Sequence, residues 1–490
     1  MKELILAVYL DPRPVAVVVG LLLGILGLTM FFPAVVDYLE HNSDWQVFFV
    51  SGLVTTAFSG LLFLAVRSQN RIMTTRQAFI MTASVWISLS AFGALPFYWS
   101  GFFPTYTDAF FESISGLTTT GATVMTDLDF MPPGILLWRG ILQWLGGLGI
   151  IVMAVAVLPM LQIGGMQLFK VEAFETLEKI LPRATQISGF ITLIFLNATV
   201  LCMLAYLMAG MNILDAVVHA MTTVATGGFS NHDESLGYFD SMLIDYIAII
   251  FMIIGSLPFL LFVQAFQGMP KSIFFDSQVR TFFMLLMFLV LIAWIIEESL
   301  GIRTGIQALR FAAINVTSIL TGTGYATEAY DHWGPVSVSF FFVIMFIGGC
   351  AGSTSCGIKI FRFQVLFQNV RQHIARVLYP HGIFIQKFNG RPISSDVISA
   401  VMSFFFLYLM TFSVSVIALS FFGVDPLTAL SGAGSAISNV GPGLGNIIGP
   451  SGNYKLLGDI PKWILAFTML IGRLELFTIL VLFSPRFWRS

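Results

Sequence analysis

The sequence has few cysteines, few histidines and few charges, and each scarcity excludes a class of protein. The three cysteines (Cys202, Cys350 and Cys356) are odd in number and show no C-x-x-C spacing, which argues against a disulfide framework or a zinc site. The six histidines form no H-E-x-x-H motif, and no nucleophile–base pair points to another kind of enzyme. Only 10% of the residues are charged, and a net charge of -2 gives no basic face for nucleic acid.

Apolar residues, in contrast, are abundant: they make up 57% of the 490 residues, and 49 positions are phenylalanine. They fall mostly in blocks of about 18 or more, the length that a helix needs to cross a bilayer. The first block lacks a small-residue cleavage site and is expected to be a retained helix. We therefore predict an all-α membrane protein with ten transmembrane helices, at Val15–Val36, Val47–Val66, Ala78–Trp99, Ile135–Leu161, Ile187–Met208, Met242–Phe266, Phe282–Ile296, Val336–Ile358, Ile398–Phe422 and Trp463–Phe483.

The few charges are sorted between the two sides of the predicted membrane. Of the 24 Lys and Arg, 18 fall in alternate connections, namely 1–13, 67–76, 163–186, 268–280, 356–393 and 485–490. The other side of the predicted membrane, with Asp245 at the start of a span included, holds only four Lys and Arg but 18 Asp and Glu. Because basic loops stay in the cytoplasm, both termini are predicted to be cytoplasmic, and the acidic outer side should attract cations. The cytoplasmic segment 361–379 reads as an amphipathic helix.

A repeat of about a hundred residues occurs four times in the outer connections. The four stretches read SISGLTTTGATV, HAMTTVATGGFS, TSILTGTGYATE and SAISNVGPGLGN, with one glycine at a common phase in each. These glycines are separated by 107, 96 and 117 residues and are Gly121, Gly228, Gly324 and Gly441. The second stretch has two adjacent glycines, so Gly227 is an alternative to Gly228. Four recurrences in phase indicate one structural unit used four times.

Other positions keep the same phase within the repeat. Asp108 and Asp215 precede the key glycine by 13 residues and are predicted to cap a short re-entrant helix. Nine residues before it stand the polar residues Glu112, His219 and Asn315, and we interpret Glu112 and His219 as braces of that helix rather than as ion ligands. A further glycine recurs in each following span, at Gly146, Gly255, Gly348 and Gly472.

Physical constraints restrict what such a unit can do. Non-helical backbone at membrane depth is tolerated only where it is buried in protein or lines a watery cavity. If four extended Gly/Thr segments face one another, their carbonyl groups can replace the hydration shell of a cation. The alternatives are close helix packing through small residues, and a secondary transporter of another cation or small solute that binds it at discontinuous helices. The parallel orientation of the repeats favours a pore.

With these repeats the chain resembles the Trk/Ktr/HKT superfamily of potassium transporters, and specifically the Trk-type membrane subunit, over residues 75–490. The resemblance implies four parallel helix–pore–helix repeats around one pseudo-fourfold pore, preceded by an N-terminal two-helix hairpin. The corresponding segments are the hairpin at 1–74 and the pore repeats at 75–170, 171–270, 271–390 (with a cytoplasmic helix) and 391–490. Potassium is then the permeant ion, and no covalently bound cofactor is expected.

The resemblance also implies which residues form the K+ selectivity filter. Carried over by motif, they are Thr119, Thr120 and Gly121; Thr226, Gly227 and Gly228; Gly322, Thr323 and Gly324; and Asn439, Val440 and Gly441. Glycine at the key phase of all four repeats goes with potassium preference in this superfamily. The T-V-G-Y-G motif of tetrameric potassium channels is absent, so strict exclusion of Na+ is not assumed.

Two further elements resemble the gating parts of the superfamily. The first is the stretch GGCAGSTSCGIK, which corresponds to an intramembrane loop beneath the filter and contains Gly348, Gly349, Gly352, Ser353 and Gly357. Its glycines and serines are also poor helix formers. The second is Arg473 in the middle of a span, where an unpaired charge costs at least about 2.5 kcal/mol. The alternatives are a kinked helix without a gating role and an arginine paired with a distant acid.

The resemblance finally implies the setting of the protein. It suggests a multi-pass protein of the bacterial cytoplasmic (inner) membrane, a homodimer, and a cytoplasmic nucleotide-binding regulatory subunit that controls the gate. Potassium uptake is the function that these expectations indicate. Whether the flux is passive or coupled to protons or sodium is left open by the sequence.

Overall fold

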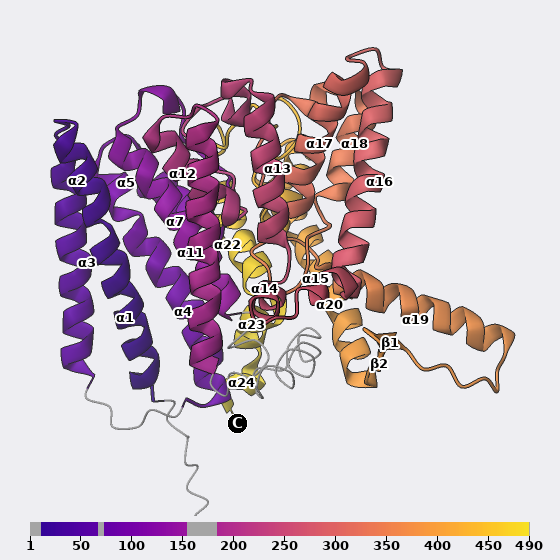
Figure 1. Cartoon of the computed structure of the whole chain (residues 1–490). Helices are drawn as coiled ribbons and strands as arrows, with labels where there is room; N and C mark the ends of the chain where they lie inside the picture. Colours follow the sequence, from indigo (N-terminus) through magenta and orange to yellow (C-terminus); the bar gives the residue numbers. More distant parts are fainter. Residues whose placement is uncertain (1–10, 67–72, 154–183, 490) are drawn as a thin grey trace, which may run out of the picture.

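The computed structural model describes residues 11–66, 73–153 and 184–489, and these form an array of helices with one small β-hairpin. The first described turn of α1 and the last helix, α24, lie at the same end of the molecule (Figure 1). The helices are α1 (Arg13–Thr29), α2 (Phe31–Leu39), α3 (Trp45–Ala65), α4 (Thr75–Gly93), α5 (Leu95–Trp99), α6 (Tyr106–Leu117), α7 (Pro133–Val152), α11 (Ala184–Met208), α12 (Ile213–Val224), α13 (Met242–Ser256), α14 (Phe259–Phe266), α15 (Lys271–Phe275), α16 (Ser277–Ser299), α17 (Gly305–Thr321), α18 (Pro335–Ile344), α19 (Ile360–Leu378), α20 (Ser395–Phe421), α21 (Pro426–Ser438), α22 (Asp459–Arg473), α23 (Leu476–Leu480) and α24 (Pro485–Arg489).

In the described residues, seven helices are long and apolar enough to cross a membrane, or nine if each of two bent pairs counts as one span. These nine follow the order of the predicted spans. The remaining predicted span, Val336–Ile358, the eighth along the chain, contains a helix of only ten residues, α18, and then an irregular segment. The C-terminal part of the predicted span Ile135–Leu161 and the loop at 163–186 fall largely outside the described residues.

Two predicted spans bend sharply where a continuous helix was expected. The first turns by 89° between α13 and α14, at Leu257 and Pro258. Proline cannot donate the backbone hydrogen bond that would continue a helix, which explains the break there. The second turns by 114° between α22 and α23, where Glu475 adopts a positive φ of 60°. Both bends end a helix near the centre of the molecule and redirect the chain.

The N-terminal hairpin is held by small residues. A Cβ at Gly27 of α1 would lie 2.7 Å from Cγ2 of Thr56 on α3, and Ser59 Oγ donates a 2.6 Å hydrogen bond to the Gly20 carbonyl. Within a bilayer, helices associate through such close backbone approach and interhelical hydrogen bonds rather than through the hydrophobic effect. The hairpin lies along one side of the molecule, where α1 packs against α4 (Figure 1).

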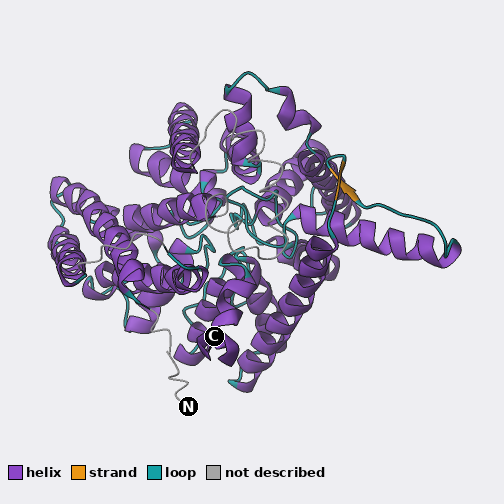
Figure 2. Cartoon of the chain, turned by 90° about the horizontal axis from the view of Figure 1, so that it is seen from below, coloured by secondary structure: helices purple, strands orange, loops and turns teal. Residues whose placement is uncertain are grey.

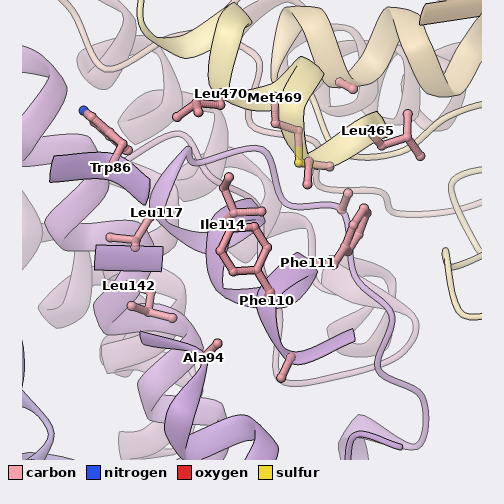
Figure 3. Packing of buried hydrophobic residues seen from close by; sticks show 14 of the residues in the cluster. Trp86, Ala94, Phe110, Phe111, Ile114, Leu117, Leu142, Leu465, Met469 and Leu470 are labelled. Atoms are coloured by element: carbon pink, nitrogen blue, oxygen red, sulfur yellow. The ribbon is translucent and has the colours of Figure 1, made fainter. Parts of the chain in front are cut away.

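Four short helices are buried at the centre: α6, α12, α17 and α21. Each is followed by an extended Gly/Thr-rich segment, and seen from below these loops gather in the middle, surrounded by helices (Figure 2). The helix α6 packs against α4, α7 and α22, which brings the first and last parts of the sequence together. Figure 3 shows this cluster, which includes Trp86, Ala94, Phe110, Phe111, Ile114, Leu117, Leu142, Leu465, Met469 and Leu470.

Three of the four recurring span glycines make room for the end of a short helix. A Cβ would lie 1.9 Å from the Leu117 carbonyl oxygen at Gly146, and 2.8 Å from that of Val224 at Gly255. At Gly472 it would lie 2.2 Å from the Ile437 carbonyl oxygen. Each of these carbonyl groups belongs to a residue four positions before the key glycine. The recurring glycine therefore lets the following span approach the backbone of its own short helix.

The predicted amphipathic helix at 361–379 is confirmed as α19, which projects sideways from the rest of the molecule (Figure 1). It leads to a two-stranded antiparallel hairpin of β1 (Lys387–Phe388) and β2 (Arg391–Pro392). At its base, Arg362 is buried, pairs with Glu475 and lies 3.7 Å over the ring of Phe404. The helix is thereby fixed to the bend that follows α22.

Candidate functional site

The four key glycines adopt the same unusual backbone conformation. Their φ angles lie in the left-handed region, which glycine enters at no steric cost. The values are 84° for Gly121, 76° for Gly228, 83° for Gly324 and 108° for Gly441. The residue two positions earlier is also left-handed in every repeat, with φ of 51° for Thr119, 49° for Thr226, 73° for Gly322 and 51° for Asn439.

The same four glycines approach one another in a closed cyclic order, and we call them the glycine ring. If each ring glycine carried a Cβ, that atom would face a backbone carbonyl oxygen of the next repeat. The carbonyl group belongs to the residue just before the ring glycine of that repeat. The distances are 2.3 Å from Gly121 to the Gly227 oxygen, 1.9 Å from Gly228 to Thr323, 2.0 Å from Gly324 to Val440 and 2.7 Å from Gly441 to Thr120. The order runs from the first repeat through the fourth and back to the first. No side chain larger than hydrogen fits at these positions.

This order decides which glycine of the second repeat corresponds to the others. Gly228 shares the positive φ and the cyclic contact, whereas Gly227 takes the place of Thr120, Thr323 and Val440. The alternative alignment on Gly227 is therefore wrong.

The residues nine positions before the ring glycine tie each short helix to the segment after the ring. Glu112 accepts hydrogen bonds from Thr123 Oγ1 at 2.9 Å and from the Val124 amide at 2.9 Å. In the second repeat, His219 Nε2 and Ser230 Oγ are 3.0 Å apart. In the third, Asn315 Nδ2 donates to Thr327 Oγ1 at 3.0 Å. In the fourth, where the position is glycine, Ser431 Oγ accepts from the Leu444 amide at 3.0 Å. These contacts match the predicted bracing.

The prediction that Asp108 and Asp215 cap the short helices is wrong in position. The caps are Thr105 and Asn212, whose side chains accept from the amides of Asp108 and Asp215 at 3.2 Å and 2.8 Å. The aspartates are the third residues of their helices. There a carboxylate still faces the positive end of the helix dipole, which explains why an acid recurs at this place.

Above the ring, toward the end of the molecule where the predicted acidic connections lie, the structure has a hollow of about 260 Å³. All four ring glycines line it, together with Asp127, Asp233 and Arg139. Arg139 is buried, and its Nε donates a 2.8 Å hydrogen bond to Glu112, while its Nη1 donates to the Ser230 carbonyl at 2.6 Å. It therefore joins α6 of the first repeat to the segment that follows the ring in the second repeat, with its charge neutralised by Glu112.

A histidine at the edge of this hollow joins the same two repeats. His232 is hydrogen-bonded through Nδ1 to Asp129 and through Nε2 to Asp215 at 3.1 Å, and its ring stacks on Tyr238 with centroids 3.5 Å apart. Burial disfavours the imidazolium form, but the hydrogen bonds with the two aspartates outweigh burial, so the pKa of His232 is raised above its usual value. The charged form of His232 thus stabilises this outer contact.

We expect the folded protein to lose stability as the pH rises above neutrality, and His232→Asn to remove most of this loss. A histidine whose pKa is higher in the folded state contributes stability that is complete below its unfolded pKa of about 6.5 and disappears as the pH rises through the folded pKa. Melting temperatures of the purified protein between pH 5.5 and 9 should show a difference of about 2 °C between wild type and variant at the acidic end, shrinking at the alkaline end. A constant difference across this range would contradict the assignment.

Below the ring, on the side where α1 begins and α24 lies, residues 345–359 fold as an irregular loop instead of a helix. Its backbone bonds to two other elements, α13 and α21: the Cys350 amide donates to the Ser256 carbonyl at 3.1 Å, Thr354 to Gly255 at 3.0 Å and Gly357 to Ser438 at 2.9 Å. The predicted helix break is therefore confirmed, although it begins at Met345, before the glycines. Within the loop, Gly352 and Gly357 adopt left-handed φ angles of 75° and 71°. Two internal hydrogen bonds hold it, from the Gly349 amide to Ser355 Oγ and from Ser353 Oγ to the Cys350 carbonyl. A Cβ at Gly348 would lie 1.8 Å from the Cys356 carbonyl oxygen.

Arg473 contacts this loop directly under the ring. Its Nη1 donates to the Thr354 carbonyl at 3.2 Å and lies 2.7 Å from Sγ of Cys356, which in turn is 3.5 Å from Thr119 Oγ1. Arg473 is 5% exposed, and its Nε and Nη2 have no partner among the described residues. A cavity of about 40 Å³ is lined by Arg473, Asn439, Gly472 and the loop.

The alternative that Arg473 pairs with a distant acid finds no support in the described part of the chain. Its nearest acid in the sequence, Glu475, pairs with Arg362 instead. An arginine that keeps its charge beneath a cluster of carbonyl groups would oppose any cation that passes there.

Two residues at the site escaped the sequence analysis. Gln143 of α7 bonds to the backbone on both sides of Gly228, and Tyr454 donates a 2.8 Å hydrogen bond to the Gly441 carbonyl. For Gln143 a signal existed, because the equivalent positions, three residues before the other span glycines, are Met252, Met345 and Met469. Tyr454 stands 13 residues after Gly441, where the other repeats have Gly134, Ser241 and Ser337, so it carried no such signal.

Comparisons with known proteins agree with the geometry. The model of a family described as cation transport protein, TrkH, matches residues 44–490. The chain is 39% identical to the Trk system potassium uptake protein TrkI of Halomonas elongata, with 97% of each chain covered. It is 37% identical to TrkH of Escherichia coli K12, covering 98% of this chain and 99% of that one.

A solved structure is also closely similar. The crystal structure of the potassium transporter TrkH from Vibrio parahaemolyticus superimposes with a TM-score of 0.91 at 35% identity, covering 98% of this chain and all of the other. The chain therefore belongs to the TrkH family of cation transport proteins; it is a Trk-type membrane subunit, a transporter and not an enzyme.

Proposed function

We propose that the protein takes up potassium across the cytoplasmic membrane, through a selectivity filter of backbone carbonyl groups at the glycine ring. The observation that carries this proposal is the closed cyclic order of the four ring glycines, each against the carbonyl group that precedes the next. Four equivalent extended segments around one axis can surround a dehydrated cation with carbonyl oxygens. The similar proteins named as potassium uptake proteins support K+ as the permeant ion.

In this proposal α6, α12, α17 and α21 are re-entrant pore helices of four parallel repeats around a pseudo-fourfold pore. Their C-terminal ends, which carry partial negative charge, precede the filter and favour a cation there. The protein then has ten spans, with α18 and the loop after it as the eighth. The filter comprises the twelve residues expected from the sequence: Thr119, Thr120, Gly121, Thr226, Gly227, Gly228, Gly322, Thr323, Gly324, Asn439, Val440 and Gly441.

The loop at 345–359 and Arg473 form the gate in this proposal. The buried guanidinium and the loop residues occupy the space directly beneath the filter and leave only a small cavity. A positive charge there raises the barrier for K+. Opening requires the loop, the end of α22, or both to move away from the axis.

The proposed location is the bacterial inner membrane, with both termini in the cytoplasm. The sorting of Lys and Arg supports this orientation, as does the position of α1 and α24 at one end of the molecule. The resemblance to the Trk-type subunit adds a homodimer and a cytoplasmic nucleotide-binding regulatory subunit to the proposal. The latter would act on the end of the molecule at which α19 projects.

The purified protein in proteoliposomes should conduct K+ and Rb+ at least about tenfold faster than Na+, and should exclude a neutral solute of similar size. The measurement is uptake of each species down its own gradient, with empty liposomes as the control. Equal flux of the neutral solute would contradict the proposal and favour the alternative, a secondary transporter of another cation or small solute. Dependence of K+ flux on a proton or sodium gradient would indicate coupling rather than passive conduction.

A further inference from the structure

The ring is not equivalent in its four repeats, and the difference is concentrated at the residue before each ring glycine. In the first and third repeats this residue is threonine, and its hydroxyl bonds to the threonine two positions earlier: Thr120 to Thr118 at 2.7 Å, and Thr323 to Thr321 at 2.8 Å. In the second repeat the position is Gly227, which has no side chain. The second repeat therefore lacks the internal brace of its two neighbours in the ring.

The side chain of Gln143 occupies the space that Gly227 leaves. A Cβ at Gly227 would lie 2.4 Å from Cδ of Gln143, so the two positions share one volume. Gln143 Nε2 donates a 2.6 Å hydrogen bond to the Gly227 carbonyl, and its Oε1 accepts from the Phe229 amide at 3.0 Å. The amide thus holds the backbone immediately before and after Gly228. Gln143 is fully buried, so neither bond competes with water.

This arrangement has no counterpart in the other repeats. The equivalent positions are Met252, Met345 and Met469, which are buried and cannot form such a pair of hydrogen bonds. In the described part of the chain, no side chain donates to the carbonyl oxygens of Thr120, Thr323 or Val440. The carbonyl of Gly227 alone among these four is engaged by a side chain.

We propose that Gln143 is a positioning residue that sets ion specificity at the glycine ring, by replacing the side chain that the second repeat lacks at Gly227. This inference rests on the proposed function and deepens it, because it assigns part of the discrimination between cations to a residue outside the twelve filter positions. A carbonyl group that already accepts a hydrogen bond is a weaker and less mobile ligand for a cation. The ring is therefore asymmetric, because among the described residues a side chain holds the Gly227 carbonyl but not the carbonyls of Thr120, Thr323 and Val440.

The test compares Gln143→Met, which introduces the residue of the other three repeats, with Gln143→Glu. Met removes both hydrogen bonds, whereas an ionised Glu still accepts from the Phe229 amide but cannot donate to Gly227. In proteoliposomes of the full chain, we expect the K+/Na+ flux ratio of Gln143→Met to fall by about tenfold, the effect of losing two buried hydrogen bonds, with K+ flux itself changed far less. We expect Gln143→Glu also to lower the ratio. Unchanged ratios in both variants would overturn the inference.

A paired substitution separates specificity from folding. Gly227→Thr alone should disrupt the ring, because its Cβ overlaps Gln143, while Gly227→Thr with Gln143→Ala should recover folded protein and a K+/Na+ ratio nearer to that of wild type. If neither Gln143 variant folds, this double variant decides: recovery supports the inference, and failure to recover overturns it. The wild-type control distinguishes the two proposals, since a wild type that does not discriminate K+ from Na+ refutes the filter itself, whatever the variants do.

Discussion

Replacing Gly228 with alanine is expected to lower the K+/Na+ flux ratio by at least about tenfold while the protein still inserts into the membrane. The new Cβ would lie 1.9 Å from the Thr323 carbonyl oxygen, against an ordinary carbon–oxygen contact of about 3.3 Å. Gly228 and Thr323 must therefore separate by about 1.4 Å, and both belong to the proposed filter. Ion discrimination by carbonyl groups depends on the number and placement of those groups, so it should be lost before the fold.

The effect of backbone strain at a left-handed glycine must be separated from the effect of a Cβ that crowds the ring. Gly423 provides the matched control, because its φ is 84° but nothing lies within 4 Å of the position of its Cβ. Gly423→Ala should cost about 1–2 kcal/mol of stability and leave the flux ratio unchanged. The measurement is the K+/Na+ flux ratio in proteoliposomes, with monodisperse elution as the criterion of folding. If alanine at each of the four ring glycines leaves this ratio unaltered, the filter proposal is wrong.

The repeated positions explain why so much of the ring could be expected from one sequence. A left-handed φ and a backbone contact both demand glycine, so a fourfold structure leaves a fourfold signal. At the second repeat the same reasoning named Gly228 but left Gly227 as an alternative, because two adjacent glycines are both required there, for different reasons. Gly228 must be glycine because of its positive φ and its contact with the Thr323 carbonyl. Gly227 must be glycine because Gln143, 84 positions earlier in the chain, fills the space of a side chain. A pattern along the chain does not contain such a distant constraint.

The error over the helix caps has a local cause. Asp108 and Asp215 recur at one phase, and aspartate is a good capping residue, so the sequence alone predicts that they are the caps. The side chains that accept from the helix amides belong to Thr105 and Asn212, three residues earlier, and the aspartates in turn accept hydrogen bonds from these two side chains. The spacing of a polar residue and an acid three positions later was visible in the sequence and would have given the correct helix start.

The broken spans show what hydrophobicity cannot predict. Residues 336–358 are apolar enough for a span, yet the helix ends at Ile344 because the loop amides find partners on α13 and α21 instead of within a helix. Proline at 258 gave a signal for the bend after α13, but nothing comparable precedes Glu475, where α22 ends. Composition places a segment in the membrane, whereas its path there depends on hydrogen bonds between distant parts of the chain.

Substitution of Arg473 by glutamine should raise K+ flux by roughly thirtyfold, while Arg473→Lys should leave it close to the wild-type value. At a separation of about 7 Å and an effective dielectric constant of about 20, a unit charge raises the energy of a passing K+ by about 2 kcal/mol. Removing that charge lowers the barrier by the same amount, which corresponds to about thirtyfold in rate. Glutamine retains a donor for the Thr354 carbonyl, so this variant separates the charge of Arg473 from its hydrogen bond to the loop.

The comparison with Arg473→Ala then shows whether the loop contributes on its own. Alanine removes both the charge and the contacts with Thr354 and Cys356, so it should raise K+ flux at least as much as glutamine does. If the loop blocks the path only while Arg473 holds it, the alanine variant will conduct faster than the glutamine variant. Selectivity should be unchanged in both, because Arg473 contacts none of the ring glycines. Flux and open probability equal to wild type in all three variants would remove Arg473 from the gate and leave the loop as the only barrier beneath the filter.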